Sequence, residues 1–365
     1  MDLFGTDTDL AGTGANTEVS VVRPGMTRRA ERNRVFLRLL TWAVTLVGVG
    51  AFFVLLNQLG VDAVYEGLSS LGQLWPLLLV LEAARVVCEL AGTRALLGTT
   101  TAHMPTLRLI RGQLIAQALD VVMPAGRAAA EAAKAAVYAR EVGVPQAAAI
   151  GTALQLAVLF ANALWALAGF YVSGMLGLPS ALRVGLLSYT AASCLLVLGV
   201  IVFAAAPPVR GWFSHLHLFR ASLERFAQLL AVAPGRLVFA LAAQLVGRCV
   251  QALQLAVAGT VLGAQFTLPQ IALTQAVYLV GAALGDLVPA QLGTTDAAFV
   301  LAAPTLGLTA ASAFSVAVAM HAVQLLMAGV YGLGALFIWW LESNGQSNHN
   351  QTHSASRPAA KLPQT

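Results

Sequence analysis

The chain has 365 residues, of which 58% are hydrophobic and only 10% are charged, and its formal net charge is +5. A soluble domain carries about 25% charged residues, so this composition excludes an ordinary soluble protein and predicts an all-α polytopic membrane protein. The positive charge does not predict nucleic-acid binding, because the basic residues lie beside apolar segments.

The two ends of the chain differ in composition from its middle. Residues 1–35 are polar and rich in arginine, which predicts a disordered, basic, cytoplasmic arm that contacts anionic headgroups. Residues 36–340 hold the apolar segments and are predicted to form one transmembrane domain. Residues 341–365, rich in Asn, Gln, Ser and His, are predicted to form a disordered cytoplasmic tail.

Six apolar segments are long enough to cross a bilayer as helices: 36–56, 74–96, 147–173, 184–205, 237–263 and 311–340. Two more apolar runs, 109–123 and 271–288, each end at a proline, Pro124 or Pro289. The first run would form about 22 Å of helix, which is shorter than the roughly 30 Å hydrocarbon core. Both runs are therefore predicted to be broken helices.

Basic residues indicate which loops face the cytoplasm. If each broken run enters the membrane and returns to its own side, both termini are cytoplasmic and Arg183 is the one basic residue in an outside loop. If each run crossed once, Arg127, Lys134 and Arg140 would lie outside. The sequence thus favours six full spans and two re-entrant hairpins, or hairpins of short helices that nearly cross.

The two broken runs are similar when they are aligned at their prolines. The first reads LIAQALDVVMPAGRAAAEAAKAA and the second YLVGAALGDLVPAQLGTTDAAFVLAA. Each has an aspartate before the proline, Asp120 or Asp286, and an acid seven residues after it, Glu131 or Asp296. Three full spans separate the runs, which predicts an inverted repeat of the kind that secondary transporters use. The alternative is two ordinary proline kinks that are similar by chance.

The residues after the prolines also have a recognisable spacing. Pro124 is followed by Ala129, Ala130, Glu131 and Lys134, and Val288-Pro289-Ala290-Gln291-Leu292-Gly293 is followed by Asp296 and Phe299-Val300-Leu301. This spacing resembles the motifs P-x4-G-G-E-x-x-R and V-P-G-A-L-G-x-x-E-G-x-x-V-L of a flippase-like family. That family includes the transmembrane region of lysylphosphatidylglycerol synthases, and the closest resemblance is to its hopanoid-associated branch.

The chain departs from these motifs in several places. The two glycines of the first motif are alanines here and its arginine is Lys134, while the glutamate of the second motif is Asp296. The resemblance covers most of residues 36–340 by span pattern, but only the two broken segments by motif. It implies a membrane protein that translocates or transfers a lipid in a bacterial inner membrane. The synthases have a soluble transferase domain after their spans, and we expect no aminoacyl transfer here.

Charged residues inside the spans are candidates for a cavity, because a charge at the centre of a bilayer costs at least about 2.5–3.5 kcal/mol. Glu82, Arg85 and Glu89 share one face of their span, where they either pair with one another or line a cavity. Arg248 lies near the middle of another span, with Gln244 and Gln251 on or beside its face.

These glutamines and Arg248 either form hydrogen bonds between helices or have a role in ligand binding. In the second case Arg248 would be a counter-ion for Asp120 or Asp286, or a ligand for a lipid phosphate. His321 either lines the same cavity or is a packed hydrogen-bonding group.

The candidate substrate and cavity residues are Asp120, Pro124, Arg127, Glu131, Lys134, Gln244, Arg248, Gln251, Asp286, Pro289, Gly293, Asp296 and His321. The sequence shows no catalytic triad, metal-ligand spacing or phosphate-binding loop, so we expect neither an enzyme nor a cofactor nor a metal.

The leading hypothesis is a flippase-like transporter of a hopanoid or phospholipid. The alternatives are an ion-coupled transporter of a small solute and a non-transporting scaffold for lipid-synthesis enzymes. Membrane lipids are the expected partners, with lipid-synthesis or envelope-transport proteins as further candidates.

Overall fold

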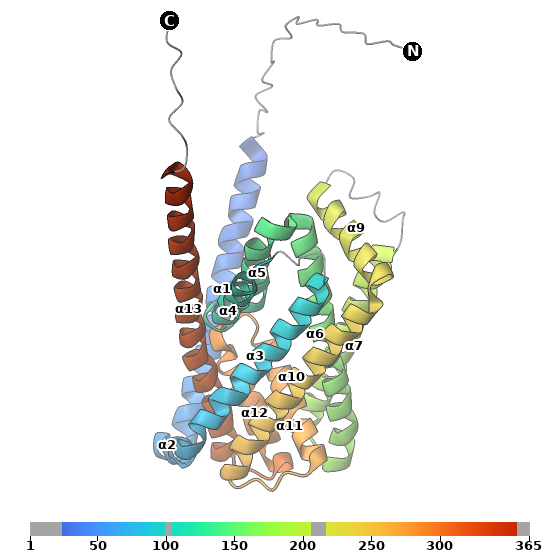
Figure 1. The fold of residues 1–365 in the computed structure, drawn as a ribbon. Helices are drawn as coiled ribbons and strands as arrows, with labels where there is room; N and C mark the ends of the chain where they lie inside the picture. Colours follow the sequence, from blue (N-terminus) through green and yellow to red (C-terminus); the bar gives the residue numbers. More distant parts are fainter. Residues whose placement is uncertain (1–23, 99–103, 206–216, 356–365) are drawn as a thin grey trace, which may run out of the picture. The chain divides into compact units, whose positions relative to one another are not determined.

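The computed structural model describes residues 24–98, 104–205 and 217–355, and these residues are helical apart from short connections (Figure 1). The predicted all-α class is confirmed for this part of the chain. The chain divides into two compact units, Met1–Trp42 and Ala43–Thr365. All of the contacts described below lie within the second unit.

The described helices are α1 (Pro24–Leu59), α2 (Val61–Ser70), α3 (Trp75–Leu97), α4 (Thr106–Val122), α5 (Gly126–Val142), α6 (Val144–Leu176), α7 (Ser180–Ala205), α9 (His217–Val232), α10 (Pro234–Val261), α11 (Leu268–Leu284), α12 (Thr294–Leu306) and α13 (Ala310–Ala355). Two 3-10 turns, η1 (Gly72–Leu74) and η3 (Pro289–Gln291), connect some of them.

Five of the described helices are long and apolar enough to cross a membrane: Trp42–Leu59, Val144–Leu176, Ser180–Ala205, Pro234–Val261 and Ala310–Asn344. They correspond to five of the six predicted spans. The sixth, 74–96, is the helix α3, whose 23 residues include Glu82, Arg85 and Glu89. That α3 crosses the membrane stays a prediction.

The helices extend further toward both ends of the chain than composition predicted. α1 begins at Pro24 and α13 continues to Ala355, so residues 24–35 and 341–355 are helical rather than unstructured. Adding a residue to an existing helix needs no new nucleus, so a span can continue into polar sequence at low cost. Residues 1–23 and 356–365 lie outside the described residues.

Both predicted helix breaks are present, and each separates two helices that pack against each other. α4 ends at Val122, three residues lie between, and α5 then packs along α4. α11 ends at Leu284, and the turn η3 leads into α12, which packs along α11. In Figure 1, α4 and α5 lie toward the upper end of the unit Ala43–Thr365, and α11 and α12 lie toward its lower end. Proline breaks the helix because it has no N–H to donate and restricts the residue before it.

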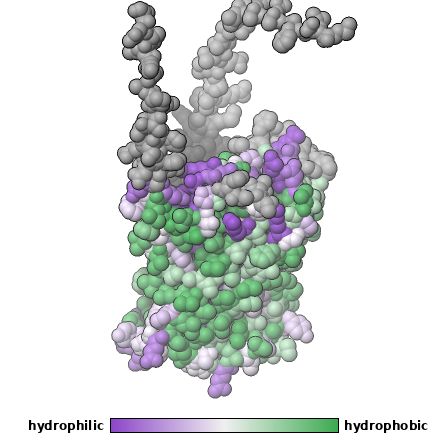
Figure 2. Space-filling model, viewed as in Figure 1, coloured by the Kyte–Doolittle hydropathy of each residue, from purple (hydrophilic) through white to green (hydrophobic). Residues whose placement is uncertain are grey.

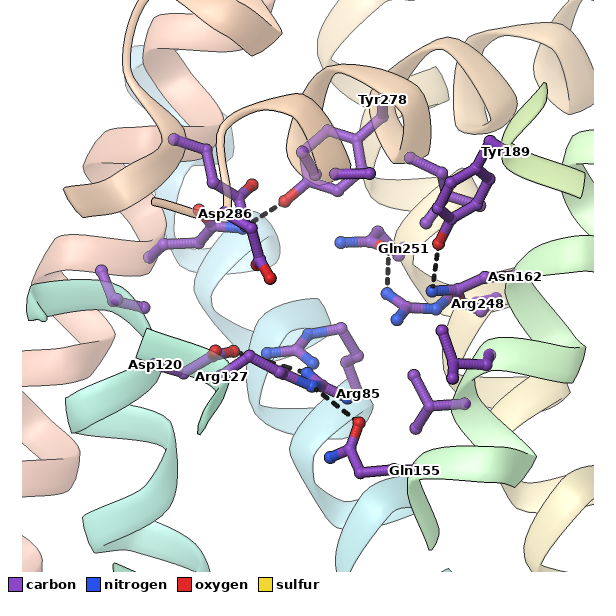
Figure 3. Close-up of a pocket in the computed structure, with 18 of the residues that line it drawn as sticks. Arg85, Asp120, Arg127, Gln155, Asn162, Tyr189, Arg248, Gln251, Tyr278 and Asp286 are labelled. Atoms are coloured by element: carbon purple, nitrogen blue, oxygen red, sulfur yellow. Dashed lines mark hydrogen bonds and ion pairs between the residues drawn. The ribbon is translucent and has the colours of Figure 1, made fainter. Parts of the chain in front are cut away.

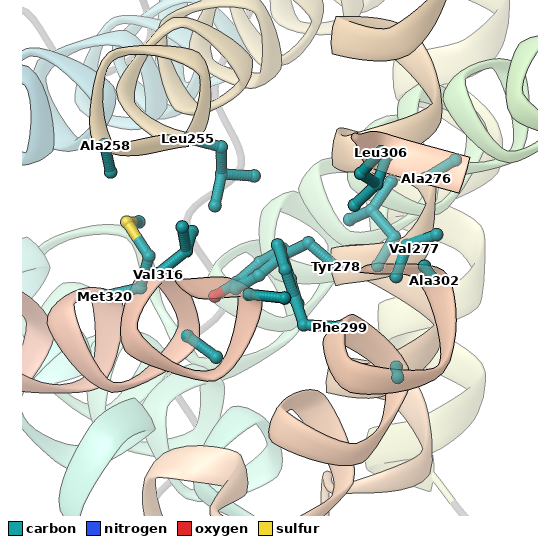
Figure 4. Packing of buried hydrophobic residues seen from close by; sticks show 14 of the residues in the cluster. Leu255, Ala258, Ala276, Val277, Tyr278, Phe299, Ala302, Leu306, Val316 and Met320 are labelled. Atoms are coloured by element: carbon teal, nitrogen blue, oxygen red, sulfur yellow. The ribbon is translucent and has the colours of Figure 1, made fainter. Parts of the chain in front are cut away.

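Each hairpin is held by its own apolar cluster. Around the second hairpin, Leu255 of α10, Tyr278 of α11, Phe299 of α12 and Met320 of α13 are buried together (Figure 4). A separate cluster packs α5 and α6 against α3, α4, α9 and α10. Because these clusters fix the hairpins, the residues at the hairpin tips have defined positions.

The outer surface of the second unit is apolar over its middle. Figure 2 shows, on the face in view, hydrophobic residues between two zones where hydrophilic residues gather. Leu195 of α7, Val238 of α10 and Leu333 of α13 are among the large apolar side chains that point outward. Outward-facing apolar residues on long helices are typical of a protein surrounded by lipid.

Candidate functional site

The tips of the two hairpins share one backbone feature. The residue after each proline, Ala125 or Ala290, is left-handed, with a φ of 53° in both. This conformation costs roughly 1–2 kcal/mol for a residue with a side chain, so the surrounding packing must impose it. The sequence similarity around the two prolines therefore corresponds to a shared way of turning the chain.

Glycines allow close backbone approach at each tip. A Cβ atom on Gly126 would lie 2.1 Å from the carbonyl oxygen of Asp120. A Cβ atom on Gly293, whose φ is 83°, would lie 2.0 Å from the carbonyl oxygen of Gly48 in α1. Any larger residue at Gly126 or Gly293 would push the tip away from its neighbour.

The two tips meet at one polar cavity of about 220 Å³ (Figure 3). Asp120 and Arg127 reach it from the first hairpin, and Asp286, Ala290 and Gln291 reach it from the second. Long helices complete its wall, with Arg85 from α3 and Arg248 from α10. The lining therefore contains three guanidinium groups and two carboxylates.

Two of the three arginines have charged partners. Arg127 Nη1 lies 3.5 Å from Asp120 Oδ2, within the first hairpin. Arg85 Nη2 lies 2.7 Å from Glu82 Oε1 on the same helix, and it also donates to Gln117 Oε1 at 3.0 Å. Arg85 thus combines the intrahelical pairing and the cavity-lining position that the sequence left as alternatives.

Arg248 has no such partner. Its Nη1 donates to Gln251 Oε1 at 2.8 Å, and within the described part of the chain no carboxylate lies at ion-pair distance from it. Asp286, on the opposite side of the cavity in Figure 3, also forms no ion pair with any residue that the structure describes. Arg248 is therefore not a direct counter-ion of Asp120 or Asp286, and its half-buried charge faces the cavity.

Amides and tyrosines complete the polar lining. Asn162 Nδ2 donates to Tyr189 Oη at 3.1 Å, and Gln324 Nε2 donates to Tyr278 Oη at 2.6 Å. Asn162, Tyr189, Tyr278 and Gln155 were not among the candidates from sequence. Each is a polar residue in an apolar run, and this indicates a polar group inside the protein. The sequence does not show, however, which of these residues face one cavity.

A buried ionic network lies beside the cavity and joins the first hairpin to α3. Lys134 Nζ lies 2.7 Å from Glu131 Oε1 and 3.5 Å from Glu89 Oε1. Gln117 Nε2 donates to Glu89 Oε2 at 2.8 Å. Glu131 and Lys134, both predicted cavity residues, thus belong to this network rather than to the lining of the main cavity. Gln244 lines a small space of about 10 Å³ next to Arg248, Arg85 and Glu89.

Asp296 and His321 form a second buried pair, away from the residues that line the cavity. Asp296 Oδ2 accepts the backbone N–H of Gly293 at 2.7 Å, which caps α12. His321 Nε2 of α13 lies 3.2 Å from Asp296 Oδ1. The structure places these two residues in a packed junction between α12 and α13, so His321 is the packed hydrogen-bonding group of the two alternatives. Pro124 and Pro289, which were also predicted site residues, affect the site through the helix breaks that they cause.

Comparison with known proteins identifies one family. A family model described as "Lysylphosphatidylglycerol synthase TM region" matches residues 40–332. The match includes both hairpins and every charged residue that lines the cavity. No curated protein and no solved structure matches the chain.

Proposed function

The chain belongs to the lysylphosphatidylglycerol synthase transmembrane-region family and is a multi-pass membrane protein of lipid-related function. On this premise, we propose that it moves a polar lipid across or out of a bacterial inner membrane. The lipid is a phospholipid or a hopanoid, and the protein is a transporter rather than an enzyme. The observation that carries the proposal is a polar cavity with an unpaired arginine, enclosed by apolar helices.

Arg248 is the group that favours a phosphate-bearing headgroup. A guanidinium group binds phosphate oxygens through two parallel hydrogen bonds, and these are strong because both partners are charged. Keeping a half-buried cation without a carboxylate partner is costly in an apolar environment. A ligand anion in the cavity would supply the missing partner, with Arg85 and Arg127 nearby on the other walls.

The hairpins would give access to this site. We propose that both are re-entrant, that they enter from opposite sides of the membrane as an inverted repeat, and that both chain termini are cytoplasmic. Irregular backbone at membrane depth is tolerated where it lines a cavity, as Ala290 and Gln291 do here. Small shifts of either tip would open the cavity to one side, which is the way that transporters with inverted repeats alternate access.

The test is lipid movement in vesicles that contain the purified protein, with labelled phospholipid and labelled hopanoid compared side by side. We expect movement above that in empty vesicles, and the preferred label identifies the lipid class. Arg248→Ala should lower the rate at least about tenfold, because a hydrogen bond to a charged group contributes about 1.5–3 kcal/mol and 1.4 kcal/mol corresponds to tenfold. Arg248→Lys should retain part of the rate.

Arg220→Ala is the matched control, since Arg220 lies exposed on α9 and pairs there with Glu224. Absence of lipid movement with folded wild-type protein would refute the proposal. Saturable uptake of a water-soluble compound without lipid movement would replace it with solute transport.

A further inference from the structure

A second hollow, of about 340 Å³, opens beside the polar cavity. It lies where α5 and α7 both pack against α6. Small residues of α5 and α6, Ala135, Ala148 and Gly151, form its floor, and Leu196 and Val200 of α7 form a wall. We call this hollow the α6 recess. Its size is within the range of roughly 300–1,000 Å³ that ligand pockets occupy. Seven of its ten lining residues are apolar, and the polar ones are Glu131, Thr152 and Gln155.

The α6 recess adjoins the polar cavity. Gln155 and Leu159 line both spaces, so these two side chains form the partition between them. A ligand with a charged end and an apolar end could therefore occupy both spaces at once.

Gln155 has an unused donor at this partition. Its Oε1 accepts a hydrogen bond from Arg127 Nε at 3.3 Å. Because a guanidinium group can only donate, this contact fixes the orientation of the amide and leaves Nε2 as the free end. Among the residues that the structure describes, Nε2 is buried without a hydrogen-bond partner. A buried N–H group of this kind calls for an acceptor from a ligand.

We propose that the α6 recess binds an acyl chain of a phospholipid whose phosphate lies in the polar cavity, with Gln155 Nε2 donating to an ester or phosphate oxygen at the partition. This inference rests on the proposed function for the identity of the ligand as a lipid. An acyl chain is the occupant that fits, because the recess is mostly apolar, adjoins a site of suitable charge for phosphate, and lies on helices with outward-facing apolar residues. Inside a bilayer such a chain gains packing contacts rather than hydrophobic transfer energy, so the recess positions the lipid while the charged cavity retains it.

Photo-crosslinking tests the proposal independently of transport. The wild-type protein is reconstituted in phosphatidylglycerol vesicles that contain a trace of phosphatidylglycerol with a diazirine in one acyl chain. After irradiation, we expect adducts concentrated on the residues that line the α6 recess, such as Thr152 and Leu196. Adducts spread evenly over the outward-facing helices would overturn the proposal.

Three variants sharpen the test. Ala148→Phe fills the floor of the recess and should lower labelling there at least fivefold, whereas Ala168→Phe, the same change at an exposed position of α6, should leave it unchanged. Thr152→Trp fills the recess from its exposed rim and replaces Ala148→Phe if that variant fails to elute as folded protein. Gln155→Leu keeps the shape of the side chain but removes the donor, and it should also lower labelling severalfold.

The outcomes separate this inference from the proposed function. Labelling of the recess that Ala148→Phe abolishes, in a protein that moves no lipid, would support the acyl-chain site and refute transport. Normal lipid movement by Ala148→Phe, together with unchanged labelling, would refute the acyl-chain site and leave transport standing.

Discussion

Ala125 and Ala290 both adopt a left-handed conformation, with a φ of 53° at each, one residue after the proline of their respective hairpins. The two residues lie at the tips that meet at the polar cavity. A non-glycine residue adopts this conformation only where its surroundings impose it. The shared geometry therefore links the sequence repeat to the position of the candidate site.

Replacing Ala125 tests this backbone strain. Ala125 is half-buried, so a larger side chain there has room, but a β-branched residue tolerates a positive φ poorly. We expect Ala125→Val to lower the free energy of unfolding by about 1–3 kcal/mol. Ala125→Gly should be close to neutral, because relief of strain offsets the greater entropy of the unfolded chain.

Thermal unfolding in detergent, followed by circular dichroism, measures both effects. Ala168→Val, within α6, controls for the intrinsic cost of valine in place of alanine. If Ala125→Val unfolds at the temperature of this control, the left-handed conformation is not present in solution.

Lys134 should be essential for the stability of the first hairpin. Its buried ammonium group lies between Glu131 and Glu89, and removing one partner of a buried ion pair typically costs about 3–5 kcal/mol. Lys134→Met should therefore lower the unfolding temperature strongly, and adding Glu131→Gln should recover part of the loss. Arg220→Ala breaks an exposed pair and should cost at most about 1 kcal/mol. Equal stability of the Lys134 and Arg220 variants would contradict the buried network.

The buried pair of Asp296 and His321 should serve stability rather than ligand binding. His321→Ala leaves Asp296 with the Gly293 N–H as a partner and should cost about 1–3 kcal/mol. The lipid movement per folded molecule should be unchanged at a temperature where the variant is folded. Arg248→Ala should show the opposite pattern, with near-normal stability and slow lipid movement. A His321→Ala variant that is stable but inactive would place His321 in the transport path.

Cysteine labelling tests the sidedness of the first hairpin. In a background that lacks Cys88, Cys194 and Cys249, Val144→Cys places an exposed thiol at the start of α6, next to its connection with α5. If α4 and α5 form a re-entrant hairpin, an impermeant thiol reagent should label this position from the cytoplasmic side. Labelling from the outside would show that the broken segment crosses the membrane. Thr309→Cys, exposed between α12 and α13, is the control, since it faces the outside in both arrangements.

Local signals in the sequence were sufficient for the membrane class and for the helix breaks. Composition alone indicated a polytopic membrane protein, and five of the predicted spans correspond to helices of sufficient length and hydropathy. Pro124 and Pro289 marked both breaks because proline disrupts helical hydrogen bonding wherever it occurs. The sequence marked Arg248 as a candidate because placing an arginine in the middle of an apolar run costs free energy wherever that run lies.

Which polar residues share a site was decided only by the tertiary structure. Glu131 and Asp296 occupy equivalent positions after their prolines, yet one pairs with Lys134 and the other with His321, and neither lines the polar cavity. Gln155 and Tyr278 line that cavity, although their own segments do not show which way these polar side chains face. The rotation of each helix about its axis depends on how its neighbours pack, and that is a property of distant segments in contact. The sequence therefore determined where the chain breaks and where charge enters the membrane, and packing determined which of those charges face a ligand.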